Sequence, residues 1–216
     1  MRAFAICFTA IVASVVVVGQ EQAAIVDPTA YEVYAAVLAR SDLPAMMKKA
    51  RPLVVQRETT LMGLCGVDES RLSEPWRSVA ESFRDENRCT GSLANHDREC
   101  AGRTLDASRI TEPRIVMRTR TEIAGFFERN RPWDWAPFHT AFPDSGGYLT
   151  MSAVGLDASR SHALVSVYFG CDSLCGEGGT YFLERNATGW QFVQPPGVER
   201  CRVFSRRQWV DTTTLA

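Results

Sequence analysis

The sequence predicts an α+β fold, in which amino-terminal helices pack on a carboxy-terminal twisted antiparallel sheet. Two observations support this prediction. Before about residue 145, apolar residues recur with the period of an amphipathic helix, whereas after it apolar and polar residues alternate as in half-buried strands. Successive strands joined by short turns usually pair as neighbours, which gives an antiparallel meander. The chain has 216 residues and no linker-like tract, so we expect a single globular domain over residues 25–216.

Three helices are expected in the amino-terminal part. The first covers residues 29–40, where Thr29 and Glu32 form a capping box that satisfies free backbone donors at the helix start. Thr119 and Glu122 form a second capping box before a short helix. A third helix begins near residue 73, and its apolar residues repeat at helical spacing: Trp76, Val79, Ala80 and Phe83.

Strands are expected from short apolar or alternating runs bounded by turn residues. Two precede residue 145, at residues 53–59 and 114–118, and four follow it, at 148–154, 163–169, 178–185 and 189–193. Weaker candidates lie at 201–204 and 208–212. The connector from Asp157 to Ser161 has hairpin composition, and the turn from Asn186 ends at Gly189, which can adopt a positive φ.

Residues 1–24 are expected to be a secretory signal. Arg2 precedes an apolar run at 6–18, and small residues allow cleavage near 19/20 or 24/25. The run is shorter than the roughly 20 residues that a spanning helix needs, so a cleaved signal is favoured over an uncleaved anchor. No other segment is apolar enough to cross a membrane. We therefore expect a secreted or periplasmic protein.

Cysteine content agrees with export. After signal cleavage six cysteines remain, an even number that predicts disulfides in an oxidising compartment. Proximity in the sequence suggests two pairs, and the third follows by subtraction: Cys89–Cys100, Cys171–Cys175 and Cys65–Cys201.

The stretch GCDSLCGEGG, at residues 170–179, could hold a metal, a phosphate or a redox site. Zinc would need two more ligands, a phosphate loop would need a basic residue before a helix, and a redox pair prefers two intervening residues. The remaining interpretation is a disulfide across a wide turn, in which glycines let the chain reverse. If the turn binds a ligand, Asp172 and Glu177 are its candidate polar groups. We expect no metal and no cofactor.

The segment RPWDWAPFHTAF, at residues 131–142, is the most aromatic part of the chain. Trp133 and Trp135 could stack on a sugar or grip a peptide beside His139, since exposed aromatic rings mark binding surfaces. Packing in the core is the alternative, because Trp is mostly buried. A formal net charge of -1 gives no reason to expect nucleic acid.

The predicted function is therefore an exported, non-enzymatic binding or interaction domain stabilised by disulfides, whose small-molecule or protein partner is unknown. The alternative is a hydrolase of the envelope or the extracellular space that uses His139, Asp144 or Glu177 for acid–base chemistry. The sequence leaves the question of catalysis open, because no Gly-x-Ser-x-Gly turn or other catalytic motif is present.

One pattern over residues 126–193 resembles a family of uncharacterised exported bacterial proteins. It includes Phe-Pro-x-Ser-x-Gly at 142–147, Ser-x-Val-Gly at 152–155, Cys-x3-Cys-Gly-x-Gly at 171–178 and Gly-Trp at 189–190. The resemblance implies export from a bacterium and a single domain, and it assigns no catalytic residue. The chain departs from the pattern at Asp172, where the family has glycine.

Overall fold

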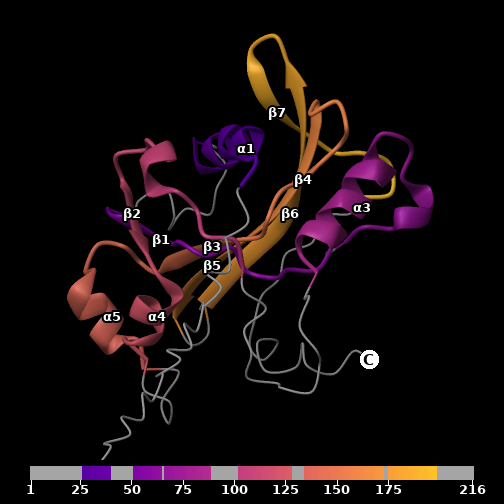
Figure 1. Cartoon of the computed structure of the whole chain (residues 1–216). Helices are drawn as coiled ribbons and strands as arrows, with labels where there is room; N and C mark the ends of the chain where they lie inside the picture. The colour runs from indigo at the N-terminus through magenta and orange to yellow at the C-terminus, as the bar shows by residue number, and fades with distance from the viewer. Residues whose placement is uncertain are drawn as a thin grey trace, which may run out of the picture.

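The computed structural model describes residues 26–39, 51–64, 66–88, 102–127, 134–172 and 175–198. The chain is a mixed α/β protein whose strands lie mostly in the carboxy-terminal half (Figure 1). Several predictions lie outside the described residues: the signal at 1–24, the weak strands at 201–204 and 208–212, Trp133, and four cysteines, Cys65, Cys89, Cys100 and Cys201.

The helices are short, and two single 3-10 turns at Glu69–Arg71 and Ala107–Arg109 accompany them. Their bounds are α1 Pro28–Ala39, α3 Trp76–Glu86, α4 Arg120–Ala124 and α5 Ala136–Ala141. No helix in the described part of the chain has the length and apolar character that crossing a membrane requires.

The strands form one mixed sheet. Their bounds are β1 Leu53–Gln56, β2 Ile115–Arg118, β3 Tyr148–Met151, β4 Gly155–Leu156, β5 His162–Asp172, β6 Cys175–Asn186 and β7 Gly189–Val193. The strand order is β2-β1-β3-β5-β6-β7, and β4 pairs with β5 off this path. The antiparallel meander predicted for the carboxy-terminal third is confirmed from β3 through β7.

The sheet is nevertheless mixed rather than antiparallel as predicted, because β1 pairs in parallel with both β2 and β3. Parallel neighbours need a crossover connection, and the long segment between β1 and β2, which contains α3, supplies it. All four residues of β1 are buried. A continuous apolar run such as Leu53-Val54-Val55 is typical of a parallel strand covered on both faces, and this signal distinguishes β1 from the alternating strands.

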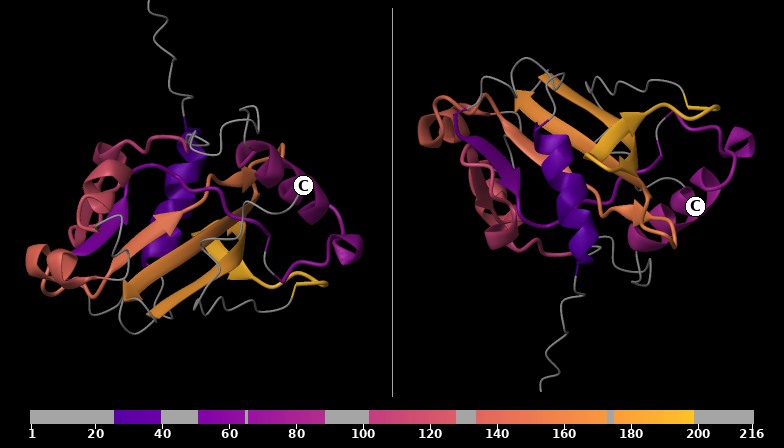
Figure 2. Two further views of the ribbon diagram at one scale, coloured as in Figure 1. Left: turned by 90° about the horizontal axis from the view of Figure 1, so that it is seen from below. Right: turned by 90° about the horizontal axis from the view of Figure 1, so that it is seen from above.

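Alternate residues of the sheet belong to two different hydrophobic clusters. Ala163, Val165 and Val167 of β5 cluster with residues of α1, among them Val33 and Val37, which are completely buried. Figure 2 shows α1 lying across the strands. The intervening Leu164, with Phe182 of β6, clusters instead with α3, and the predicted apolar face of that helix is confirmed: Trp76, Val79, Ala80 and Phe83 are all buried.

A third cluster is aromatic and lies at the opposite end of the molecule from α3, beside α4 and α5 (Figures 1 and 2). Its buried members are Val54, Phe138 and Phe142. Val54 belongs to this cluster whereas its neighbours Leu53 and Val55 belong to the cluster of α1, as the alternation of a strand requires.

One of the two predicted capping boxes is confirmed. The Thr119 hydroxyl accepts a hydrogen bond from the Glu122 backbone N–H at 3.1 Å, and the Glu122 carboxylate accepts one from the Thr119 N–H at 2.6 Å. The box at Thr29 and Glu32 is wrong. Asp27 caps α1 by accepting a hydrogen bond from the Thr29 N–H at 2.8 Å, and Pro28 takes the first helical position, which suits its fixed φ.

Candidate functional site

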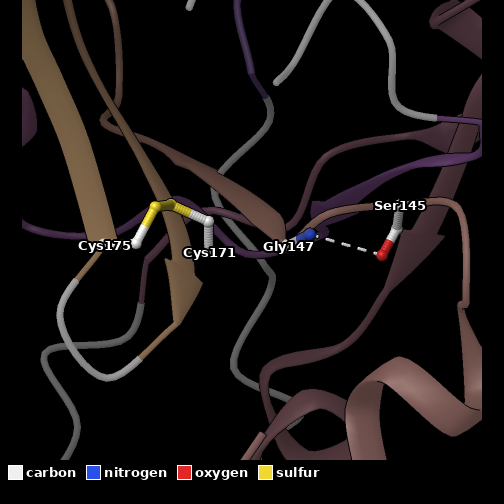
Figure 3. Close-up of a disulfide and its surroundings, with 4 residues drawn as sticks. All are labelled: Ser145, Gly147, Cys171 and Cys175. Carbon is white, nitrogen blue, oxygen red and sulfur yellow. Dashed lines mark hydrogen bonds between the residues drawn. A yellow bond between two sulfur atoms is a disulfide. The ribbon is translucent and has the colours of Figure 1, made fainter. Parts of the chain in front are cut away.

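The predicted disulfide Cys171–Cys175 is confirmed, and it joins the end of β5 to the start of β6 (Figure 3). The two Cα atoms are 5.1 Å apart, and Asp172 pairs with Cys175 in the sheet register. The reversal is therefore narrow, not the wide turn that the sequence suggested. The described residues include no cluster of three or more side chains that could bind a metal ion.

The glycines after Cys175 have a different role from the predicted one. Gly176 and Gly178 lie within β6 rather than in the turn, and a Cβ atom on Gly176 would come within 2.0 Å of the Tyr168 hydroxyl oxygen. A Cβ atom on Gly178 would come within 2.6 Å of the Val167 carbonyl oxygen. The glycines leave the space in which the ring of Tyr168 lies over the sheet, so this part of the motif serves packing.

The Ser-x-Gly part of the pattern also serves packing (Figure 3). The buried Ser145 hydroxyl donates to the Phe142 carbonyl at 2.9 Å and accepts from the Gly147 N–H at 3.3 Å. Gly147 has φ +150°, and a Cβ atom there would come within 2.0 Å of the Gly170 carbonyl oxygen. Glycine therefore allows the start of β3 to lie in close contact with the end of β5 that carries the disulfide.

The aromatic segment packs mostly against itself. Trp135 is half-buried and stacks on Tyr148, with ring centroids 5.7 Å apart, and on His139, at 5.8 Å. Phe127 and Phe138 contact the same indole edge-on at 4.9 and 5.5 Å. Because neighbouring rings already contact the indole, these contacts favour core packing over ligand stacking for Trp135.

The structure separates the polar candidates from the aromatic segment. Glu177 is half-buried and pairs with Phe169, which belongs to the cluster of α1. The next residue of β5, Gly170, faces Trp135 on the other side of the sheet. Residues paired across two strands share a face, so Glu177 lies on the face opposite Trp135. Asp144 and Asp172 are both exposed. Trp135 and His139, both within the described part of the chain, are thus in contact with each other, whereas Glu177 lies on the opposite face of the sheet.

A Ser-His-Asp cluster at the start of β5 resembles a catalytic triad in composition but not in geometry. The Nδ1 atom of His162 lies 3.1 Å from the Asp157 carboxylate and 3.0 Å from the Ser161 hydroxyl. A triad places its serine on Nε2, whereas the Nε2 atom of His162 lies 4.0 Å from Glu184. Because both partners occupy Nδ1, the imidazole cannot take a proton from Ser161 while Asp157 orients it from the other nitrogen.

A pocket of about 270 Å³ lies between the start of α1, the second half of α3, β4 and the turn before β5. Its lining combines small apolar side chains with charged ones: Val26, Asp27, Ala30, Tyr34, Ser82, Glu86, Arg103, Ala153, Val154, Leu156, Asp157, Ala158 and Arg160. Tyr34 is buried at the wall, where its hydroxyl donates to the Ser152 carbonyl at 3.0 Å, and burial raises its pKa far above the usual range.

Two ion pairs line this pocket. The Arg160 guanidinium bonds the Asp27 carboxylate at 3.0 Å, and Arg103 pairs with Glu86. Burial alone would raise the pKa of Asp27, but hydrogen bonds from Thr29 and Arg160 outweigh it and lower that pKa. Arg160 has φ +55°, a left-handed conformation that side chains other than Gly adopt rarely and at a cost of about 1 kcal/mol or more.

Asp157 holds the turn that carries Arg160. Its carboxylate accepts hydrogen bonds from the backbone N–H groups of Ser161 and His162, at 2.8 and 3.0 Å, and from the Ser159 hydroxyl at 2.5 Å. Burial alone would raise the pKa of Asp157, but these hydrogen bonds outweigh it and lower the pKa to about 2. The ionised Asp157 carboxylate therefore stabilises this turn, and its oxygens already accept hydrogen bonds from it.

No motif in the sequence indicates this pocket, because its charged residues come from four separate segments. One local signal is the Asp27-Pro28 pair. It is a typical helix start, and it predicts that α1 begins at Pro28. Comparison of the chain with protein-family models, curated proteins and solved structures finds no match.

Proposed function

We propose that this chain is an exported, non-enzymatic binding protein that holds a small ligand in the pocket between α1 and α3. The observation that carries the proposal is the pocket itself, about 270 Å³ in volume, with an apolar wall and two ion pairs. Ligand sites commonly have volumes of roughly 300–1,000 Å³ and combine apolar walls with a few polar groups, so this pocket suits a small ligand.

Export is supported by the chemistry of the cysteines. A disulfide such as Cys171–Cys175 persists in oxidising compartments and is rare in the cytosol. The apolar start of the chain and the resemblance to exported bacterial proteins agree with this interpretation. We therefore propose a periplasmic or secreted location.

The rigidity of the pocket follows from the proposed packing of α1 and α3 on the sheet. Ala30 and Tyr34 line the pocket from α1, and Ser82 and Glu86 line it from α3. The Ser82 hydroxyl accepts a hydrogen bond from the Leu156 N–H of β4 at 3.1 Å, which ties α3 to the sheet. A site on such elements is preorganised, and preorganisation reduces the entropy lost on binding.

The lining favours binding over hydrolysis. His139, Asp144 and Glu177, on which the hydrolase alternative depends, are not among the described residues that line the pocket. In addition, His139 stacks on Trp135, and Glu177 lies on the face of the sheet opposite Trp135. The Ser82 hydroxyl in the pocket bonds a backbone N–H rather than a histidine.

The proposal is tested by filling the pocket. Ala158 is exposed at its mouth, so Ala158→Trp should exclude the ligand with little effect on the core. The matched control is Ala136→Trp, at the exposed first residue of α5. Protein purified from the exported fraction is denatured, and the released small molecules are identified by mass spectrometry. A compound released by the wild type and the control but not by Ala158→Trp is expected. Equal release from all three would contradict the proposal.

A further inference from the structure

We infer that the pocket takes a short peptide with free termini, about three residues long. This inference rests on the proposed binding function and adds the chemical class of the ligand. It follows from three features of the pocket: its length, the balanced charge of its two ion pairs and its small apolar residues.

The length of the pocket follows from the part of the chain that lines it from Asp27 to Tyr34. The Asp27–Arg160 pair lies at the start of α1. The second pair, Arg103 with Glu86, lines the same pocket as Tyr34, which stands further along α1. Tyr34 stands seven positions after Asp27, which corresponds to about 10 Å along the helix axis. An extended peptide spans roughly 3.3–3.6 Å per residue, so about three residues span this length.

The charges favour a zwitterion over a simple ion. Each pair combines one arginine with one carboxylate, so neither pair favours a ligand with a net charge of either sign. A molecule with opposite charges at its two ends can interact favourably with both pairs. Asp157 also lines the pocket, but its oxygens already accept hydrogen bonds from its own turn.

The orientation of the peptide follows from the helix. The start of α1 carries the positive end of the helix dipole, which favours the ligand carboxylate near Arg160. The ion pair with Asp27 uses the Nε atom of Arg160, and a guanidinium has five N–H donors. The ligand ammonium group then lies near Glu86, whose carboxylate is half-buried.

The wall of the pocket contains small apolar residues. Ala30, which lies between Asp27 and Tyr34 along the chain, lines the pocket with Val154 and Leu156, and Ala30 and Val154 are buried. Small apolar side chains fit such a wall, whereas large or charged side chains would lose hydration without gaining a partner. Trialanine is therefore a suitable probe.

The test measures binding of three probes to the full chain by isothermal titration calorimetry: trialanine, N-acetyl-trialanine and trialanine amide. Acetylation removes the ammonium charge, and amidation removes the carboxylate. We expect trialanine to bind about tenfold or more tightly than either blocked form, because each blocked form loses a charge-assisted hydrogen bond. Equal binding of trialanine and N-acetyl-trialanine, or no binding of any probe, would overturn the inference.

Two variants assign the ends of the peptide. Glu86→Gln should weaken trialanine and its amide but leave N-acetyl-trialanine unchanged, and Arg160→Gln should weaken trialanine and its N-acetyl form but leave the amide unchanged. The control is Arg88→Gln, which removes an exposed ion pair with Asp85 just beyond α3. Circular dichroism checks that each variant is folded. If the two variants affect all probes equally, the assignment of the termini is wrong.

The outcomes separate this inference from the proposed function. A protein that releases a small molecule excluded by Ala158→Trp, but that binds none of the three probes, would retain the binding function and refute the peptide. A protein that releases no small molecule excluded by Ala158→Trp, yet binds trialanine in the predicted order, supports the peptide directly.

Discussion

The two ends of β5 differ in where their neighbouring residues come from in the sequence. At its start, the Asp157 turn and His162 lie beside the charged pocket, and the groups there come from distant segments. At its end, Gly170 and Cys171 lie beside a disulfide and a cluster of aromatic rings from one short segment. The segment that stands out in the sequence is the one that packs against itself, whereas the pocket is assembled from residues that are inconspicuous in the sequence.

The contrast has a physical reason. Aromatic side chains bury large areas, so several rings close together in the sequence gain most by packing on one another. Charged side chains are rarely buried unless they are paired. Such pairs form between any segments that the fold brings together. A pocket lined by ion pairs is therefore a product of topology, whereas an aromatic cluster follows from local composition.

The largest expected effect is on the aromatic end. Phe138 is completely buried among other rings, so Phe138→Ala should lower the free energy of unfolding by about 3–5 kcal/mol. Thr140→Ala, at an exposed position of the same helix, serves as the control and should change it by about 0.5 kcal/mol or less. Urea unfolding followed by circular dichroism measures both. A loss below about 1 kcal/mol for Phe138→Ala would show that this cluster does not stabilise the fold.

A smaller effect is expected at the stapled end of β5. Replacing Cys171 and Cys175 together by Ala removes a cross-link over a short loop, which should reduce stability by about 2 kcal/mol. Asp172→Asn, at an exposed position between them, is the matched control. Thermal unfolding without reductant compares the two variants. Equal midpoints of thermal unfolding for the double variant and the wild type would indicate that the disulfide does not constrain the unfolded chain.

The smallest effect is at the other end of β5 and depends on pH. The pKa of Asp157 is lowered from 3.8 to about 2, so the stability that its ionised form contributes is complete above about pH 4 and is lost as pH falls towards 2. Asp157→Asn should therefore be less stable than the wild type by about 1–2 kcal/mol at pH 6 and about equally stable near pH 2. Urea unfolding at several pH values measures this difference. A difference that does not change between pH 6 and pH 2 would contradict the role of the ionised carboxylate.

Local features of the fold could be predicted from the sequence. The apolar face of α3, the capping box at Thr119 and the positive φ of Gly189, +118°, are each determined by residues a few positions apart. The staple Cys171–Cys175 belongs to the same class, since it joins residues four apart. Periodicity and turn chemistry are sufficient for such features.

Features that depend on distant segments could not be predicted in the same way. The parallel pairing of β1 with β2 and β3 depends on a crossover that contains α3, and the role of Gly176 depends on where Tyr168 lies on the neighbouring strand. The pairing of Glu86 with Arg103, and of Asp27 with Arg160, likewise depends on the assembled sheet and helices. Side-chain patterns within one segment contain no information about these contacts.

The contrast between the two ends of β5 is tested most directly by measuring trialanine affinity and unfolding free energy on the same two variants. We expect Trp135→Ala, at the aromatic end, to lose about 2 kcal/mol of stability and to bind trialanine as the wild type does. We expect Ala158→Trp, at the pocket, to keep its stability and to bind at least about tenfold more weakly. The reverse result, in which Trp135→Ala abolishes binding and Ala158→Trp does not, would place the binding site in the aromatic segment and contradict the proposed pocket.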